Sequence, residues 1–225
     1  MNTPVLQATE IEKYFYSPQP FHALKKVSIN ILRGEFVALV GKSGCGKSTL
    51  LYILSTMDTS YEGKLYLDGE LLTGKSGADL ATVRNAHIGF VFQFHYLLPE
   101  FTVLQNVMLP ALKLAKYTKR EIEQKAIEKL TLLGLEAQLH KPANKLSGGQ
   151  QQRVAIARSQ INDPDILICD EPTGNLDSEN SNLVFDIFKE LTISRRQTII
   201  VVTHDNEFAK KTDRIIEMKD GYILN

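Results

Sequence analysis

Residues 41–49 read Gly41-Lys42-Ser43-Gly44-Cys45-Gly46-Lys47-Ser48-Thr49, and this stretch decides the fold. Its first eight residues match the glycine-rich pattern G-x-x-x-x-G-K-[ST], which wraps around phosphate groups. Glycines let consecutive backbone N–H groups turn toward one anion, and the helix that follows adds the positive end of its dipole. In this pattern Lys47 reaches the β- and γ-phosphates of a nucleotide, and the Ser48 hydroxyl holds Mg²⁺.

The neighbours of this phosphate loop (residues 41–49) are those that the motif needs. Residues 36–40 form an apolar run typical of a strand, and residues 47–54 are predicted to form a helix. A chance glycine turn is the alternative interpretation, but it does not explain a strand before the loop and a helix after it. The sequence therefore predicts a nucleotide-binding α/β fold.

Further strands are predicted at residues 27–31, 64–67, 88–92, 166–169 and 198–202. The last two are continuous apolar runs, as expected of buried parallel strands. The apolar face of a helix is predicted between them, formed by Leu183, Val184, Ile187, Phe188 and Leu191. This alternation indicates a parallel sheet with right-handed crossovers.

The middle of the chain is predicted to be helical. Residues 118–133 begin with Thr118 and Glu121 at capping-box spacing, carry an apolar residue every fourth position, and end at Gly134. A second helix is predicted at residues 147–159.

Two adjacent acids, Asp170 and Glu171, follow the apolar run 166–169. A buried strand has no structural use for two carboxylates at its end, because each is costly to desolvate without a partner. A phosphate site with a metal ion does use them: Asp170 binds Mg²⁺ through a water, and Glu171 orients and deprotonates the attacking water. A solvated strand end is the alternative.

Four candidate positions follow four predicted strands, namely Gly41, Gln93, Asp170 and His204. A single histidine after a strand is usually structural. In an open α/β sheet, however, ligands bind at the carboxyl ends of the strands, and all four residues belong to that edge. Their placement favours one common site.

The segment that decides the protein class is Leu146-Ser147-Gly148-Gly149-Gln150, called here the signature segment. Ser147 and Gln150 have capping-box spacing at the head of a helix, which makes a second anion-binding helix end, without a second lysine to complete it. The run L-S-G-G-Q is the signature of ABC ATPases. From Tyr14 to about Gly221 the chain resembles an ABC nucleotide-binding domain.

This resemblance implies a role for each candidate residue. Catalysis falls to Lys47, Gln93, Glu171 and His204, and Mg²⁺ binding to Ser48, Gln93 and Asp170. In its own site the chain contacts ATP through Tyr14, which stacks on adenine, and through the phosphate loop. In the partner subunit's site it contacts ATP through Ser147, Gly148, Gly149, Gln150 and Asp177. An ordinary strand aromatic is the alternative for Tyr14.

The resemblance also implies architecture and partners. We expect a phosphate-loop NTPase core with a mostly parallel sheet, a small antiparallel β subdomain and an inserted α-helical subdomain. Within one domain, 1–225, the core takes residues 1–93 and 162–225, and the helical subdomain takes 94–161. Two chains, head to tail, would form a homodimer around two ATP molecules and drive a separate membrane permease from the cytoplasmic face.

Composition agrees with this expectation. The 225 residues carry 26 Lys plus Arg and 26 Asp plus Glu, so no net basic charge attracts nucleic acid. The two cysteines, Cys45 and Cys169, form no disulfide framework and fit a reducing compartment. No signal peptide is evident near the start, and the longest apolar runs are too short to cross a bilayer. Membrane work would therefore need a partner chain.

The subfamily depends on an aromatic segment, residues 94–102, which follows Gln93 and reads Phe-His-Tyr-Leu-Leu-Pro-Glu-Phe-Thr. It is similar to the lipoprotein-releasing ATPases, and Pro172 to Ser178 is similar to these and to macrolide exporters. Ser159-Gln160 departs from the Ala-Leu usual there. We interpret the aromatic segment as part core and part docking surface for a permease helix. A cell-division ATPase that regulates a membrane partner remains an alternative, as does a non-transport ABC protein of DNA repair or translation.

Overall fold

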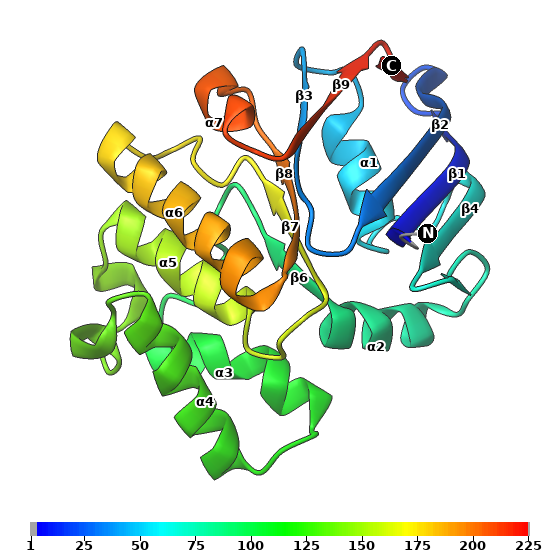
Figure 1. The fold of residues 1–225 in the computed structure, drawn as a ribbon. Coiled ribbons are helices and arrows are strands. Elements are labelled where there is room, and N and C mark those ends of the chain that lie inside the picture. Colours follow the sequence, from blue (N-terminus) through cyan, green and yellow to red (C-terminus); the bar gives the residue numbers. More distant parts are fainter. Residues whose placement is uncertain (1–3, 225) are drawn as a thin grey trace. The chain divides into compact units, whose positions relative to one another are not determined.

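The structure is a computed structural model that describes residues 4–224 (Figure 1). It has two compact units: the residues before Thr82 together with those from Lys189 on, and Thr82–Phe188. Helices α2 (Gly77–His87) and α6 (Ser178–Arg195) carry the chain from one unit to the other. The ends of the predicted domain, residues 1–3 and 225, lie outside the described residues.

An antiparallel sheet in the first unit has the order β2-β1-β4-β5. Its strands are β1 (Pro4–Phe15), β2 (Phe21–Leu32), β4 (Glu62–Leu67) and β5 (Glu70–Leu71). Buried and exposed residues nearly alternate along β2, as expected where one face of a sheet meets a core. This sheet is the antiparallel part of the predicted fold.

The first unit also contains the strand that leads into the phosphate loop. Strand β3 (Phe36–Gly41) runs parallel to β8 (Thr198–Val202) and β9 (Arg214–Lys219), and β10 (Tyr222–Leu224) pairs antiparallel with β9. All five residues of β8 are buried, which explains the apolar run at residues 199–202. Helices α1 (Lys47–Leu54) and α7 (Asn206–Lys210) follow β3 and β8 along the chain.

The second unit pairs β6 (Ile88–Val91) in parallel with β7 (Ile166–Asp170). Three helices, α3 (Val103–Leu114), α4 (Lys119–Leu132) and α5 (Gly148–Ser159), pack around one apolar cluster that includes Val107, Leu130 and Val154 (Figure 1). Each begins with a complete capping box, in which the side chains of the N-cap and third residues bond each other's backbone N–H. The short 3₁₀ turns η1 (Glu136–Gln138) and η2 (Ala143–Lys145) link α4 to α5.

Each predicted element has a counterpart in the structure. Strands β1, β5, β9 and β10 and helices α2 and α7 were not predicted. The strand predicted at 27–31 extends over Phe21–Leu32, and helix α3 was not predicted, because Pro110 and the preceding aromatic segment hide its periodicity. On α6, Leu183 was assigned to the apolar face but is 38% exposed, whereas Phe185 is buried. The helical subdomain predicted at 94–161 lies within the second unit, which extends beyond it on both sides.

Candidate nucleotide site

Two glycines give the phosphate loop its shape because neighbouring strands press against them. Gly41 and Gly46 have φ of 149° and 106°, values that favour glycine. A Cβ added at Gly41 would lie 2.2 Å from the carbonyl oxygen of Met218, and one at Gly46 would lie 2.8 Å from that of Ala23. The loop is therefore confined between β9 and β2, and only glycine fits at either position.

Lys47 is held inside the loop that it follows. Its ammonium donates to the carbonyl oxygens of Gly41, at 2.7 Å, and Lys42, at 3.0 Å, and the residue is only 8% exposed. These bonds direct the positive charge into the curve of the loop, where the first N–H groups of α1 also point. Ser48, the next residue, is exposed, as the predicted metal contact requires.

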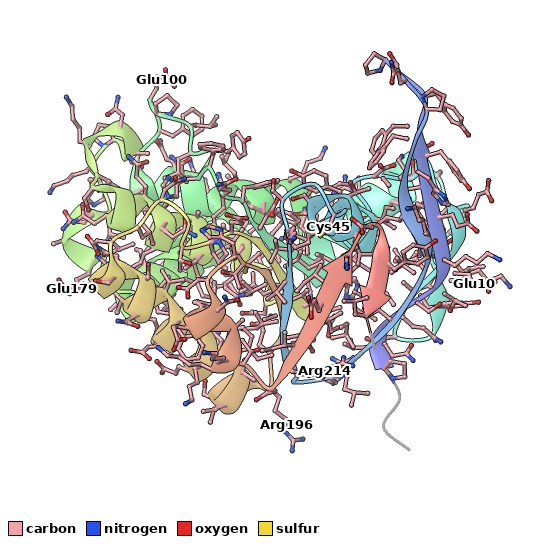
Figure 2. All side chains as sticks on the ribbon, turned by 90° about the horizontal axis from the view of Figure 1, so that it is seen from above. Glu10, Cys45, Glu100, Glu179, Arg196 and Arg214 are labelled. Carbon is pink, nitrogen blue, oxygen red and sulfur yellow. The ribbon has the colours of Figure 1, made fainter. Side chains whose placement is uncertain are left out.

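The rest of the loop is positioned through Cys45, which is labelled in Figure 2. Its N–H donates to the carbonyl of Lys42, at 3.3 Å, and its carbonyl accepts from the N–H of Gly221, at 3.1 Å. The thiol is free and buried. Ser43 and Gly44 are exposed and Thr49 is half-buried, so the outer part of the loop is open to a ligand.

His204 lies at the same sheet edge as the phosphate loop. Strands β3 and β8 are parallel, with Leu39 opposite Val202, so the residues that follow each strand emerge together. The N–H of Thr203 still bonds the carbonyl of Leu39, at 3.3 Å. Asp205 then caps α7 by accepting from the N–H of Glu207, at 2.8 Å. His204 is therefore an exposed residue held between a strand end and a helix cap.

Tyr14 belongs to a small aromatic stack on the antiparallel sheet. It lies opposite His22 in the register of β1 and β2, with ring centroids 4.0 Å apart and planes 15° apart. Its hydroxyl donates to Glu12 at 3.0 Å, and this hydrogen bond raises the pKa of Tyr14 above the ordinary value. The residue is 37% exposed. An ordered, accessible ring suits the predicted stacking on adenine. Sequence reasoning missed His22, whose only signal is its strand partner.

In the second unit, Gln93 and the two acids share another sheet edge. Val91 lies opposite Cys169 in the parallel pair β6–β7, so Gln93 and Asp170 follow neighbouring strand ends. The side chain of Asn175 donates to the carbonyl of Gln93 at 3.4 Å. Asp170 is buried, with 8% of its surface exposed.

Glu171 has φ of 45°, a left-handed conformation that costs a non-glycine residue about 1–2 kcal/mol. The turn that follows supports it, because its carbonyl accepts from the N–H of Gly174 at 3.1 Å. Strain of this kind is common where a side chain must point in a functional direction. Nothing in the sequence signalled it.

The signature segment forms the start of helix α5. Ser147 Oγ accepts from the N–H of Gln150, at 3.3 Å, and Gln150 Oε1 accepts from the N–H of Ser147, at 3.1 Å, which is the capping box expected from their spacing. Gly148 is exposed, with no atom within 4 Å of an added Cβ, whereas Gly149 is buried against Asn180. The two glycines thus have different surroundings.

Asp177 has a structural task that the sequence analysis missed. Its carboxylate accepts from the backbone N–H of Asn180, at 2.8 Å, and from the Asn180 side chain, at 2.9 Å. It therefore caps α6, and the backbone N–H of Asn180 is the main cause that lowers the pKa of Asp177. An acid three residues before Asn180 at a helix start was the available signal. Its expected contact with a second chain stays a prediction.

The donors assigned to Mg²⁺ fit that ion chemically. Hydroxyl, carboxylate and amide oxygens are hard ligands, and Mg²⁺ usually takes one or two from a protein and the rest from water and phosphates. Residues 4–224 contain no group of three or more His, Cys, Asp or Glu that would form a metal cage of their own. Coordination of Mg²⁺ by Ser48, Gln93 and Asp170 stays a prediction.

A family model described as "ABC transporter" matches residues 24–174, which include the phosphate loop, the signature segment and both acids. The chain belongs to this family. It is an ABC ATPase, as the signature segment predicted.

Curated ABC relatives match almost the whole chain. The lipoprotein-releasing system ATP-binding protein LolD of Aquifex aeolicus is 46% identical over 220 residues, which cover 98% of this chain and 96% of that protein. LolD of Bacteroides fragilis is 47% identical over 215 residues, which cover 95% and 97%.

Solved ABC cassettes have the same fold. The dimeric structure of MJ0796, a bacterial ABC transporter cassette, matches with a TM-score of 0.91 and 38% identity, over 98% of this chain and 97% of that one. A dimeric post-hydrolysis state of MJ0796 bound to ADP and Pi matches over the same shares, with a TM-score of 0.90 and 38% identity. The predicted phosphate-loop fold and ATPase activity are thereby confirmed.

Proposed function

We propose that this ABC ATPase is the motor of a lipoprotein-releasing transporter, which dimerises around two Mg-ATP and drives a separate membrane subunit. The observation that carries this proposal is the near full-length similarity to proteins named as LolD, at 46% and 47% identity. No helix within residues 4–224 is both long and apolar enough to cross a membrane. The membrane-spanning part would therefore be supplied by another chain, with this one on its cytoplasmic face.

In the proposed mechanism each predicted site residue has its own role. The phosphate loop and Lys47 bind the phosphates of ATP, and Tyr14 stacks on the adenine. Glu171 orients a water molecule and takes its proton as the water attacks the γ-phosphorus, while the bond from that phosphorus to the β–γ bridging oxygen breaks and ADP leaves. Gln93 contacts Mg²⁺ and the attacking water, and His204 contacts the γ-phosphate. Mg²⁺, held by Ser48, Gln93 and, through a water, Asp170, would neutralise phosphate charge.

Dimerisation follows from the signature segment. Ser147 begins a helix whose free N–H groups attract an anion, but no lysine accompanies it. Such a half-site is completed by the nucleotide of a second chain arranged head to tail. The dimeric structures of MJ0796 support this arrangement.

Docking of the membrane subunit is assigned to the aromatic segment. Phe94 and Tyr96 are 59% and 64% exposed, which is unusual for large aromatic side chains. Leu97, by contrast, packs against the apolar cluster of the helices. Arg158 of α5 donates to the carbonyls of His95 and Tyr96, both at 2.7 Å, so the segment is tied to the signature helix. A permease helix bound here would thus act directly on α5.

The catalytic assignment is tested with Glu171→Gln. The amide keeps the shape but loses the basicity, so hydrolysis should fall by about 10²–10⁴-fold while ATP binding persists. Size exclusion with ATP should then show a stable dimer. Glu123→Gln, an exposed position on α4, is the control and should behave as wild type. Near-normal turnover of Glu171→Gln would remove Glu171 from its assigned role.

The dimer is tested by adding Ser147→Arg to Glu171→Gln. The phosphate loop is untouched, so one chain should still bind ATP, but the bulky cation occupies space that the partner's phosphate needs. If this double variant still dimerises normally with ATP, the proposed dimer is wrong.

The transport assignment is tested by affinity capture of the chain from membranes of its native cell. A lipoprotein-releasing motor should co-purify with a permease and support release of lipoproteins. Capture of a cell-division protein instead would favour the regulatory alternative.

A further inference from the structure

The side-chain amide of Asn180 lies directly against the backbone of Gly149, the second residue of α5. A Cβ added at Gly149 would lie 2.2 Å from Oδ1, 2.6 Å from Cγ and 3.2 Å from Nδ2 of Asn180, and these are its three nearest atoms. Gly149 is not among the glycines with positive φ. Glycine is therefore needed there for space and not for backbone conformation.

Asn180 cannot easily move aside, because Asp177 holds its amide. Nδ2 donates to both carboxylate oxygens of Asp177, at 2.9 and 3.0 Å, and the backbone N–H of Asn180 donates to Oδ1 at 2.8 Å. Turning the side chain away from Gly149 would lose two charge-assisted hydrogen bonds. Asn180 thus connects the start of α5 to Asp177, which follows Glu171 by six residues.

Gly148, one residue earlier, is the contrasting case. It is exposed, and an added Cβ would meet no atom within 4 Å. Its φ is not positive either. Unlike Gly149, it therefore has no close neighbour among the described residues beyond its own helix.

We propose that Asn180 is a positioning residue, which locks the signature helix α5 to Asp177 and so aims Ser147 at the partner subunit's nucleotide. Gly149 is a glycine because Asn180 packs on it. This inference rests on the proposed dimer. Asn180 itself contacts neither nucleotide nor water in this role.

A change at Asn180 should affect ATP binding to the monomer and ATP-induced dimerisation differently. Binding of ATP to one chain depends on the phosphate loop and should be unchanged when Asn180 is altered. Formation of the ATP-bound dimer depends on the orientation of α5. Variants of Asn180 should therefore need a higher ATP concentration to dimerise. If Asn180 only supported the fold, replacing it would weaken ATP binding, dimerisation and thermal stability together.

The experiment uses full-length Glu171→Gln as the parent. Four changes are added to it, Asn180→Ala, Gly149→Ala, the two combined, and Gly148→Ala. Each variant is measured for melting temperature, for affinity of the monomer for a fluorescent ATP analogue, and for the ATP concentration at half-dimerisation. Asn180→Asp serves as the matched variant, because it keeps the shape but sets a carboxylate against Asp177.

Distinct results are expected for each change. Asn180→Ala and Asn180→Asp should raise the ATP concentration for dimerisation several-fold and leave monomer affinity unchanged. Gly149→Ala should lower the melting temperature and block dimerisation, and adding Asn180→Ala should recover much of both. Gly148→Ala should melt like the parent yet fail to dimerise, and Asn180→Ala should not rescue it.

The overturning results are equally specific. If Asn180→Ala does not rescue Gly149→Ala, or if Asn180→Ala alone leaves dimerisation unchanged, the positioning role is rejected. If the parent itself does not dimerise with ATP, the proposed function fails and the positioning role fails with it. The melting temperatures of the single and double variants then still decide whether Asn180 is what requires glycine at 149.

Discussion

Replacing Lys47 with alanine tests whether the phosphate loop is where the nucleotide binds. The ammonium is fixed by two carbonyl oxygens, at 2.7 and 3.0 Å, in a residue that is 8% exposed, so little reorganisation is needed before it meets a phosphate. A charge-assisted hydrogen bond is worth about 1.5–3 kcal/mol. Because 1.4 kcal/mol is a factor of ten, Lys47→Ala should raise the Kd for ATP by roughly 10- to 100-fold.

The assay is a titration of a fluorescent ATP analogue at a protein concentration at which the chain is monomeric. Lys64→Ala is the control, because Lys64 is an exposed lysine of the same unit that lies outside the phosphate loop. Its Kd should change by no more than about twofold, as for most exposed substitutions. Equal shifts in the two variants would refute the special role of Lys47. An unchanged affinity of Lys47→Ala would mean that the nucleotide sits elsewhere.

Two further predictions concern stability. In urea unfolding, Gly46→Ala should lower the free energy of unfolding by about 1–3 kcal/mol more than Gly44→Ala does. Both glycines have positive φ, but of the two only Gly46 would bring an added Cβ against other described atoms, at 2.8 and 2.9 Å. Equal losses of stability in the two variants would contradict the contact with β2. Asp163→Asn removes the carboxylate that pairs with Lys129, a residue that is 7% exposed. The free energy of unfolding should fall by about 1–2 kcal/mol at pH 7, which is less than for a fully buried pair because Asp163 is exposed. Burial opposes ionisation of Asp163, but hydrogen bonds from Lys125 and Lys129 outweigh it and lower its pKa. The stability that this ion pair contributes is present above the unfolded pKa of about 4 and is lost as pH falls through the lower folded pKa. The difference in free energy of unfolding between wild type and Asp163→Asn should therefore narrow in acid. A difference that does not change with pH would refute the ion pair.

Prediction from sequence succeeded where the signal is local. Thr118 and Glu121 lie three residues apart and bond each other's backbone, so their capping box is recognisable without knowledge of the rest of the fold. The strand at Thr198–Val202 was predicted at its observed bounds, because complete burial demands an unbroken apolar run. Helix α3 was missed because Pro110 lies inside it, although its own capping box at Thr102 was a usable signal.

By itself, the sequence determined the family of this protein and predicted its site from three motifs: a phosphate loop, a pair of acids after a strand, and a second helix start suited to an anion. Each is a short motif whose residues act together because they are neighbours in the chain. Only the tertiary structure decided how two adjacent glycines differ, because an added Cβ at Gly149 meets Asn180, 31 positions later, whereas one at Gly148 meets no described residue outside its own helix. It likewise decided that His22 stacks on Tyr14, since that pairing depends on strand register. Contacts between residues distant in sequence are set by packing, and no local pattern encodes them.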